Sequence, residues 1–200
     1  MIQIAAPFTE EKIRSLKVGD MIEVSGVVFT GRDAVHKWLH EGNDPSTAFP
    51  GFPGLREGII YHCGPVTLKK GGKWIVTAAG PTTSSREEPY QAEIIERFGV
   101  RAVIGKGGMG EKTRQACQRL GCVYLHAIGG AAQVLAECIK EVKNVYGLEK
   151  FGAPEAIWEL RVENFPVVVT IDAHGGSLHK EIEAESAENL RALQDGGSKS

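Results

Sequence analysis

Apolar residues in the first half of the chain form short segments rich in isoleucine and valine, separated by glycines and polar turns. Segments of this kind predict β-strands, which we expect over residues 21–30, 59–63 and 74–78. The first contains Gly26 and is expected to be a bent strand or a pair of strands. Residues 42–58 alternate densely between glycine and proline and predict a long irregular loop.

In the second half, helices with an apolar stripe alternate with short apolar strands. The helices are expected over residues 87–98, 111–120 and 131–145, and the strands over residues 100–104, 122–126, 157–162 and 167–171. Two earlier helices are expected over residues 10–16 and 33–41, with Thr9 and Asp33 as N-caps. Strands that alternate with helices are typical of a parallel sheet with crossover connections. The sequence therefore predicts an α/β fold with a β-rich first half and a parallel βαβ second half.

This pattern predicts one continuous domain over residues 1–185 and a polar tail over residues 186–200. The chain is acidic and helix-prone from Glu181 onward, and disorder is expected over residues 196–200. No apolar run approaches the ~18–20 residues of a membrane span, and no signal peptide is expected.

Composition narrows the functional classes. A net charge of −2 argues against a general nucleic-acid binder, which needs a concentrated basic face. Four cysteines without C-x-x-C spacing indicate free thiols in a reducing cytoplasm. The 25 glycines among 200 residues exceed the usual level of about 7%, so their positions are informative.

Three glycine-containing loops carry cations where strands meet helices. In the first, Thr30-Gly31-Arg32-Asp33, Arg32 is placed to grip a carboxylate with its guanidinium. The alternative is a surface ion pair between Arg32 and Asp33. His36 and His40 lie one helical turn further on, and a solvated helix face is favoured there over a metal pair.

The second loop, residues 79–86, places four hydroxyl side chains and Arg86 at the start of a helix. Such an end attracts anions through its unpaired N–H groups, and Arg86 adds a full positive charge. The alternative is a plain capping segment in which Ser84 or Ser85 is the N-cap.

The third loop, residues 105–110, surrounds Lys106 with four glycines. It nearly matches a nucleotide phosphate loop, but Glu111 stands before Lys112 and places a carboxylate where phosphates would bind. A small-anion loop that uses Lys106 is favoured, and a tight turn stays open as the alternative.

Weaker candidates surround these loops. His62 and Cys63 are neighbours on a strand, so their side chains should face opposite ways, and we expect a buried Cys63. Residues 128–132 are expected to pack closely against the sheet, and a structural turn is expected over residues 172–176.

Together the three loops present Arg32, Arg86 and Lys106 at one edge of the sheet, with Thr82 and Thr83 among them. Three fixed cations suit a substrate with two carboxylates, and a hydroxyl between them suits proton transfer if its pKa is lowered. The sequence contains no Ser–His–Asp triad, no convincing metal-ligand set and no dinucleotide fingerprint. These features indicate half of an active site.

Five segments in order carry a family resemblance: TGRDAVH, YHCGPV, AGPTTSSREE, VIGKGGMG and EAIWELRVENFPVVVTIDAHG. They resemble the beta subunit of class I (iron–sulfur) fumarate hydratases, a module shared with L-tartrate dehydratase and with the C-terminal part of single-chain class I fumarases. The resemblance runs from about Thr9 to Leu178.

The resemblance implies a swivelling β/β/α domain that supplies half of a fumarate–malate hydro-lyase. The other half is an alpha subunit that holds a [4Fe–4S] cluster, so no metal ligand is expected in this chain. By motif, Thr82 is the catalytic base, and the residues that bind the substrate carboxylates are Arg32, Arg86, Lys106 and Thr83.

Some points stay open. Ser85 and Glu87 stand where the family often has methionines, and the substrate is fumarate or, alternatively, tartrate. A non-catalytic dicarboxylate-binding module is a further alternative. The expected partners are the alpha subunit and a small dicarboxylate, with neither nucleic acid nor membrane; a homodimer stays open. Residues 42–58, with Phe49 and Phe52, are a candidate contact with the alpha subunit.

Overall fold

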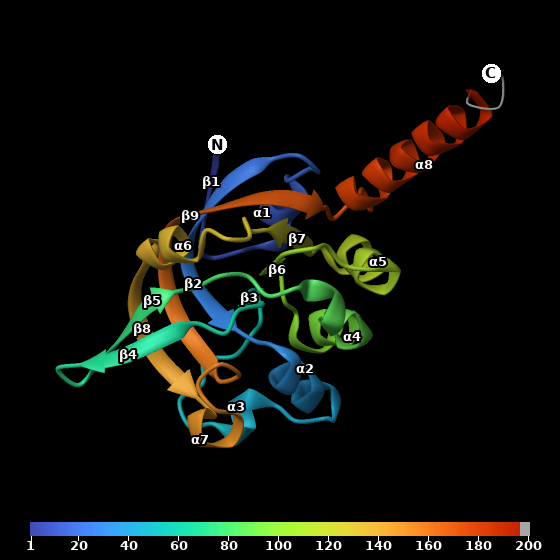
Figure 1. The fold of residues 1–200 in the computed structure, drawn as a ribbon. Helices are drawn as coiled ribbons and strands as arrows, with labels where there is room; N and C mark the ends of the chain where they lie inside the picture. Colours follow the sequence, from blue (N-terminus) through green and yellow to red (C-terminus); the bar gives the residue numbers. More distant parts are fainter. Residues whose placement is uncertain (197–200) are drawn as a thin grey trace.

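The computed structural model describes residues 1–196 and shows a mixed α/β fold around one seven-stranded sheet (Figure 1). The strands in spatial order are β1 (Ile2–Ala5), β2 (Met21–Thr30), β3 (Ile59–Tyr61), β6 (Ala102–Gly105), β7 (Val123–His126), β9 (Ile157–Ile171) and β8 (Ile139–Tyr146). The first five strands are parallel to one another, whereas β9 is antiparallel to each of its partners, β2, β7 and β8. Because β9 pairs with both β7 and β2, five of the strands close into a ring. The α/β class is confirmed, and the antiparallel strands are an addition to it.

Helices cover the outer side of the parallel strands, as Figure 1 shows for α2, α4 and α5. The helices are α1 (Glu10–Arg14), α2 (Asp33–His40), α3 (Pro45–Ala48), the 3₁₀ helix η1 (Ser84–Glu87), α4 (Glu88–Phe98), α5 (Glu111–Leu120), α6 (Ala132–Glu137), α7 (Leu148–Phe151) and α8 (Leu178–Gly196). Both α4 and α5 end at a glycine in the left-handed conformation, Gly99 and Gly121, with φ of 65° and 67°. A separate hairpin of β4 (Val66–Lys70) and β5 (Lys73–Ala78) projects from the body.

Side chains alternate along the central strands between two cores. On β3, Ile59 and Tyr61 pack with Trp158 on one side, whereas Ile60 packs with Ile94 under the helices. These two cores hold the strands rigidly, so the loops at the strand ends have fixed starting points.

The long helix predicted over residues 131–145 is wrong, because α6 ends at Glu137 and β8 follows. Ile139, Val142 and Val145 are spaced three apart, which resembles a helical stripe. The pairing of β8 with β9 has two register shifts, between residues 139 and 141 and between residues 142 and 144, and each shift places one extra residue in β8. Residues that are three apart in β8 therefore pair with residues that are two apart in β9. The strand therefore carries a helix-like period.

Four other expectations need correction. The two late strands are one continuous strand, β9, and the loop over residues 42–58 contains α3. Phe52 is buried and Phe49 half-buried, and both rings pack near Tyr146, so they are not exposed as the proposed partner contact requires. Asp33 is the first residue of α2 rather than its cap, which is Arg32.

The predicted cap of the first helix, the bend in the strand at residues 21–30 and the helical character of the acidic segment are confirmed. Thr9 caps α1 by accepting a hydrogen bond from the backbone N–H of Lys12, and β2 is bent by a register shift at Gly26. The acidic segment forms α8, which extends away from the body in Figure 1, and the disorder expected over residues 197–200 lies outside the described residues. Gly196 is the last residue of α8. None of the described helices combines the length and apolar character needed to cross a membrane.

Candidate active site at the ends of the parallel strands

Four neighbouring parallel strands end at one edge of the sheet, and two of the predicted site residues, Arg32 and Lys106, follow two of these strands. Arg32 follows β2, His62 and Gly64 follow β3, Lys106 follows β6, and Gly129 lies after β7. The carboxyl ends of parallel strands are the usual ligand-binding edge of an α/β sheet. The shared edge brings together residues from distant parts of the sequence.

Backbone hydrogen bonds attach the hydroxyl-rich segment to this edge. The N–H of Thr82 donates to the carbonyl of His62 at 2.7 Å, and the N–H of Lys106 donates to the carbonyl of Thr82 at 3.2 Å. The N–H of Ser84 then donates to the carbonyl of Lys106 at 2.9 Å, and Thr83 pairs with Lys106 in a β-bridge. Thr82 is half-buried and Thr83 is exposed. The predicted base and the predicted lysine are therefore held side by side.

Arg32 lies half-buried against Gly64. A Cβ atom at position 64 would lie 2.6 Å from Nη1 of Arg32, so only glycine leaves room for the guanidinium. The Nε atom of Arg32 lies 3.4 Å from a carboxylate oxygen of Glu155. Since Cys63, just before Gly64, pairs with Pro81, Arg32 also lies beside the start of the Thr82 segment.

Arg86 is half-exposed and pairs with Asp33, with 3.0 Å between Nη2 and the carboxylate. The ion pair expected within the first loop, between Arg32 and Asp33, is therefore wrong, because each arginine pairs with a different carboxylate. The alternative in which Ser84 or Ser85 is the N-cap is also wrong. The N-cap residues are Thr83 for η1 and Glu87 for α4, and neither side chain makes a capping hydrogen bond within residues 1–196. The Ser84 hydroxyl instead contacts His62.

Lys106 has no ion-pair partner within residues 1–196. A Cβ atom at Gly129 would lie 3.6 Å from Cδ of Lys106, so the glycine pair before α6 borders the lysine. The close packing expected of residues 128–132 holds only at their end, where the carbonyl of Ala132 accepts a backbone hydrogen bond from Ala79, whereas Ile128, Gly129 and Gly130 are exposed.

A buried polar network lies beneath the site. The side-chain amide of Gln91 lies 3.0 Å from Nε2 of His36 and 2.9 Å from Nε2 of His62. His62 Nδ1 lies 2.8 Å from the Ser84 hydroxyl, which accepts a hydrogen bond from the Tyr124 hydroxyl at 2.9 Å. Burial lowers the pKa of His36, and burial together with nearby His36 lowers the pKa of His62 well below 6.5.

The network corrects the expectation for the histidines of α2. His36 is fully buried and not part of a solvated face, whereas exposed His40 contacts Glu93. Cys63 is buried as expected, and burial raises the pKa of its thiol to about 12, which disfavours a nucleophilic role. His62 and Cys63 face opposite sides of the sheet, as predicted.

Glu87 is fully buried next to the network. Neither of its carboxylate oxygens has a hydrogen-bond partner in the described part of the chain, residues 1–196, and the nearer oxygen lies 3.8 Å from Nδ1 of His36. Burial, and then the charge of Asp33, raise the pKa of Glu87 to about 8. The structure thus contains a buried acid that favours its neutral form.

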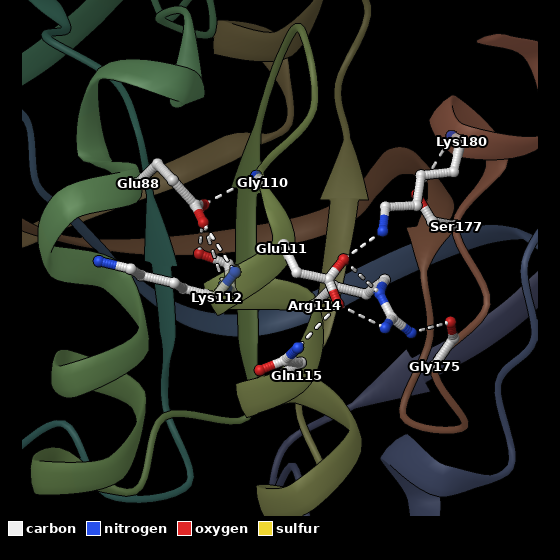
Figure 2. Close-up of polar contacts among 10 residues, drawn as sticks. Glu88, Gly110, Glu111, Lys112, Arg114, Gln115, Gly175, Ser177 and Lys180 are labelled. Atoms are coloured by element: carbon white, nitrogen blue, oxygen red, sulfur yellow. Dashed lines mark hydrogen bonds and ion pairs between the residues drawn. The ribbon is translucent and has the colours of Figure 1, made fainter.

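The anion position expected of a phosphate loop is already filled. At the start of α5, the carboxylate of Glu88 accepts hydrogen bonds from the backbone N–H groups of Gly110, Lys112 and Thr113 and from the Thr113 hydroxyl (Figure 2). Glu111 turns away toward Arg114 and Lys180, at the start of α8. Because an internal carboxylate occupies the helix N-terminus, this loop does not cradle nucleotide phosphates.

The four cysteines do not fit an iron–sulfur cluster. Cys117 and Cys122 lie in the core under the helices, whereas Cys63 and Cys138 belong to the core on the other side of the sheet, around Trp158. Within residues 1–196, no three cysteine, histidine or acidic side chains converge as metal ligands.

The sequence alone assigns no role to three residues of the site region. Gln91 and Glu155 lie in ordinary amphipathic or polar stretches and give no local signal. Glu87 stood out only as a departure from the family pattern.

The family model described as fumarase C-terminus matches residues 1–182. Over 196 residues, the chain is 55% identical to a Geobacillus stearothermophilus protein provisionally named class I fumarate hydratase, covering 98% of this chain and 37% of that protein. It is 40% identical over 186 residues to a protein of Methanocaldococcus jannaschii provisionally named L(+)-tartrate dehydratase subunit beta, covering 92% of this chain and 94% of the relative. It is 37% identical over 176 residues to L(+)-tartrate dehydratase subunit beta of Escherichia coli, covering 88% of this chain and 85% of the relative. The chain thus spans little more than a third of the first relative and most of the other two.

Proposed function

The chain belongs to the fumarase C-terminus family, and from that premise we propose that it is the beta subunit of a hydro-lyase that interconverts fumarate and L-malate. The observation that carries the proposal is the attachment of Thr82 and Lys106 to one sheet edge that also bears Arg32 and Arg86. In this proposal the domain is of the swivelling β/β/α type and acts in the cytoplasm, where its four free cysteines stay reduced.

The chemistry follows from the charges at this edge. Lys106, Arg32 and Arg86 hold the two substrate carboxylates, with the exposed Thr83 as an additional donor. Malate loses a proton from the carbon next to a carboxylate, and negative charge then develops on that carboxylate. Fixed cations stabilise this charge because they are oriented before the reaction. Thr82 first gives its hydroxyl proton to water, because the nearby cations stabilise the resulting alkoxide, and it then accepts the proton from carbon. The substrate hydroxyl leaves as hydroxide and combines with the released proton to form water, so Thr82 ends the step as a neutral hydroxyl.

The partner would complete the site. We infer an alpha subunit that holds the [4Fe–4S] cluster, because the cysteines of this chain lie in two separate cores. The names of two relatives as beta subunits support a hetero-oligomer. Association of two copies of this chain within that assembly is compatible with the proposal.

Tartrate dehydration is the second candidate. It is favoured by the two relatives that match this chain over most of their length, whereas the higher identity to the fumarate-named relative favours fumarate. Both substrates carry two carboxylates, so the three cations serve either one.

The test is expression of the chain alone and together with its alpha subunit under anaerobic conditions, followed by assays of fumarate hydration and L-tartrate dehydration. We expect the chain alone to be inactive and the complex to hydrate fumarate faster than it dehydrates tartrate. The reverse preference would establish the second candidate. Full activity of the isolated, iron-free chain would contradict the proposal, and malate binding without turnover in the complex would indicate a non-catalytic binding module.

A further inference from the structure

Glu87 lies near two arginines, and each of them already has another carboxylate close to its guanidinium group. Arg32 faces Glu155, and Arg86 pairs with Asp33, so each arginine has one carboxylate near it. The charged and titratable groups that act on Glu87 are Arg32, Asp33, His36, Arg86 and Glu155. With both arginines matched, an ionised Glu87 adds an unbalanced negative charge to a buried position.

The surroundings of Glu87 offer nothing that would stabilise this charge by hydrogen bonding. Neither carboxylate oxygen accepts a hydrogen bond within residues 1–196, although the side chain is completely buried. A buried carboxylate without donors is costly, and such a group usually takes up a proton instead. The direction of its pKa, raised to about 8, agrees with this geometry.

A bound dicarboxylate makes an ionised Glu87 still less favourable, because it brings two further negative charges to the same arginines. We propose that Glu87 is a positioning residue that takes up a proton when a dicarboxylate binds, and so couples substrate affinity to proton concentration. The inference rests on the proposed function, since it assumes that Arg32 and Arg86 hold the substrate. Neutral Glu87 adds no charge near the two guanidinium groups, whereas ionised Glu87 repels the substrate carboxylates that bind them.

The sign of the coupling follows from linkage. Dianion binding disfavours the ionised form, so the pKa of Glu87 is higher in the complex than in the free protein. Affinity is therefore full below about pH 8 and falls as the pH rises above it. For a Glu87 that stays protonated in the complex up to pH 9, malate is expected to bind about tenfold more weakly at pH 9 than at pH 7, with uptake of about half a proton per malate at pH 8.

The experiment is calorimetry of L-malate binding to the assembled complex at pH 7, 8 and 9, in pairs of buffers with different ionisation enthalpies. Wild type should take up protons at pH 8 and 9, and E87Q, which keeps the shape but cannot ionise, should show neither that uptake nor the corresponding loss of affinity. The matched control is E96Q, which removes an exposed carboxylate on α4 and should behave as wild type.

The outcomes separate the two proposals. Malate that binds the wild-type complex without proton uptake, or with the same uptake in E87Q, overturns the role of Glu87 and leaves the proposed function standing. Malate that fails to bind at pH 7 contradicts the proposed function and the coupling with it. Because the wild-type measurement needs no variant, a misfolded E87Q would not remove the test.

Discussion

The backbone N–H of Lys106 donates a hydrogen bond to the carbonyl of Thr82 across 3.2 Å. This bond joins two loops that follow different strands, and the Ser84 N–H returns a bond to the Lys106 carbonyl at 2.9 Å. The proposed base and one proposed carboxylate ligand are thus fixed by main-chain geometry. Substitution of either side chain should therefore alter chemistry or binding while leaving the loop in place.

Replacement of Thr82 by valine keeps the branched shape and removes the hydroxyl. If Thr82 is the base, kcat of the assembled enzyme should fall by about 10²–10⁴-fold, the usual contribution of a positioned acid or base. Steady-state kinetics with L-malate measure this change. Thr83→Val is the control, since its exposed side chain should affect KM more than kcat. Equal losses of kcat in the two variants would contradict the assignment.

Replacement of Lys106 by methionine removes a charge that has no ion-pair partner within residues 1–196. Lys106 is half-buried, and a substrate bound over it would bury the contact further. Loss of such a charge contact costs about 2 kcal/mol, the lower end of the range for buried charge pairs, which corresponds to an increase in KM of about 30-fold. Lys112→Met provides the control, because Lys112 is the lysine that a nucleotide phosphate loop would use. We expect its KM to stay near wild type, and similar effects of both changes would point away from Lys106 as a specific ligand.

The loops of this site could be predicted because glycines, hydroxyls and cations follow apolar strands in the sequence itself. The partners of the arginines could not be predicted in this way. Glu155 is brought to Arg32 by β9 and the segment before it, and no local pattern marks that contact. The β8 strand was missed for a different reason, since two added residues give its apolar side chains a helical period. In both cases the structure depends on contacts between residues that are distant in the sequence.

Ser84 connects the site to the buried network, so its hydroxyl should matter for stability. Ser84→Ala removes the partner of His62 Nδ1 and the acceptor of the Tyr124 hydroxyl proton, at a cost of about 1–3 kcal/mol in the free energy of unfolding. Urea denaturation measures the loss. The adjacent Ser85 is exposed, and Ser85→Ala should change stability by less than about 0.5 kcal/mol. Equal stability of both variants would mean that the network contributes little.

His62 should make the fold sensitive to acid. Its pKa lies well below 6.5 in the folded chain because burial and His36 disfavour the charged ring. The unfolded chain therefore binds the extra proton first, and stability present above pH 6.5 is lost as the pH falls, by at most about 1.4 kcal/mol per pH unit for this group. In His62→Gln, the difference in unfolding free energy from wild type should shrink between pH 7 and pH 5. His36 acts in the same direction, so the difference and not the wild-type slope is the measurement. A constant difference would contradict a neutral buried His62.

Glu88 should be a structural anchor and not a ligand of the substrate. Its carboxylate accepts three backbone hydrogen bonds and one from the Thr113 hydroxyl, and it thereby neutralises the positive end of α5 (Figure 2). Glu88→Ala leaves these donors unpaired and should lower the free energy of unfolding by about 1–3 kcal/mol. Glu96→Ala is the matched control, because Glu96 also joins α4 to α5, through an exposed ion pair with Arg119, and its loss should leave stability close to wild type. Urea denaturation of the two variants under the same conditions measures the difference in their free energies of unfolding. If Glu88→Ala proves as stable as Glu96→Ala, the carboxylate at this helix end is dispensable for folding.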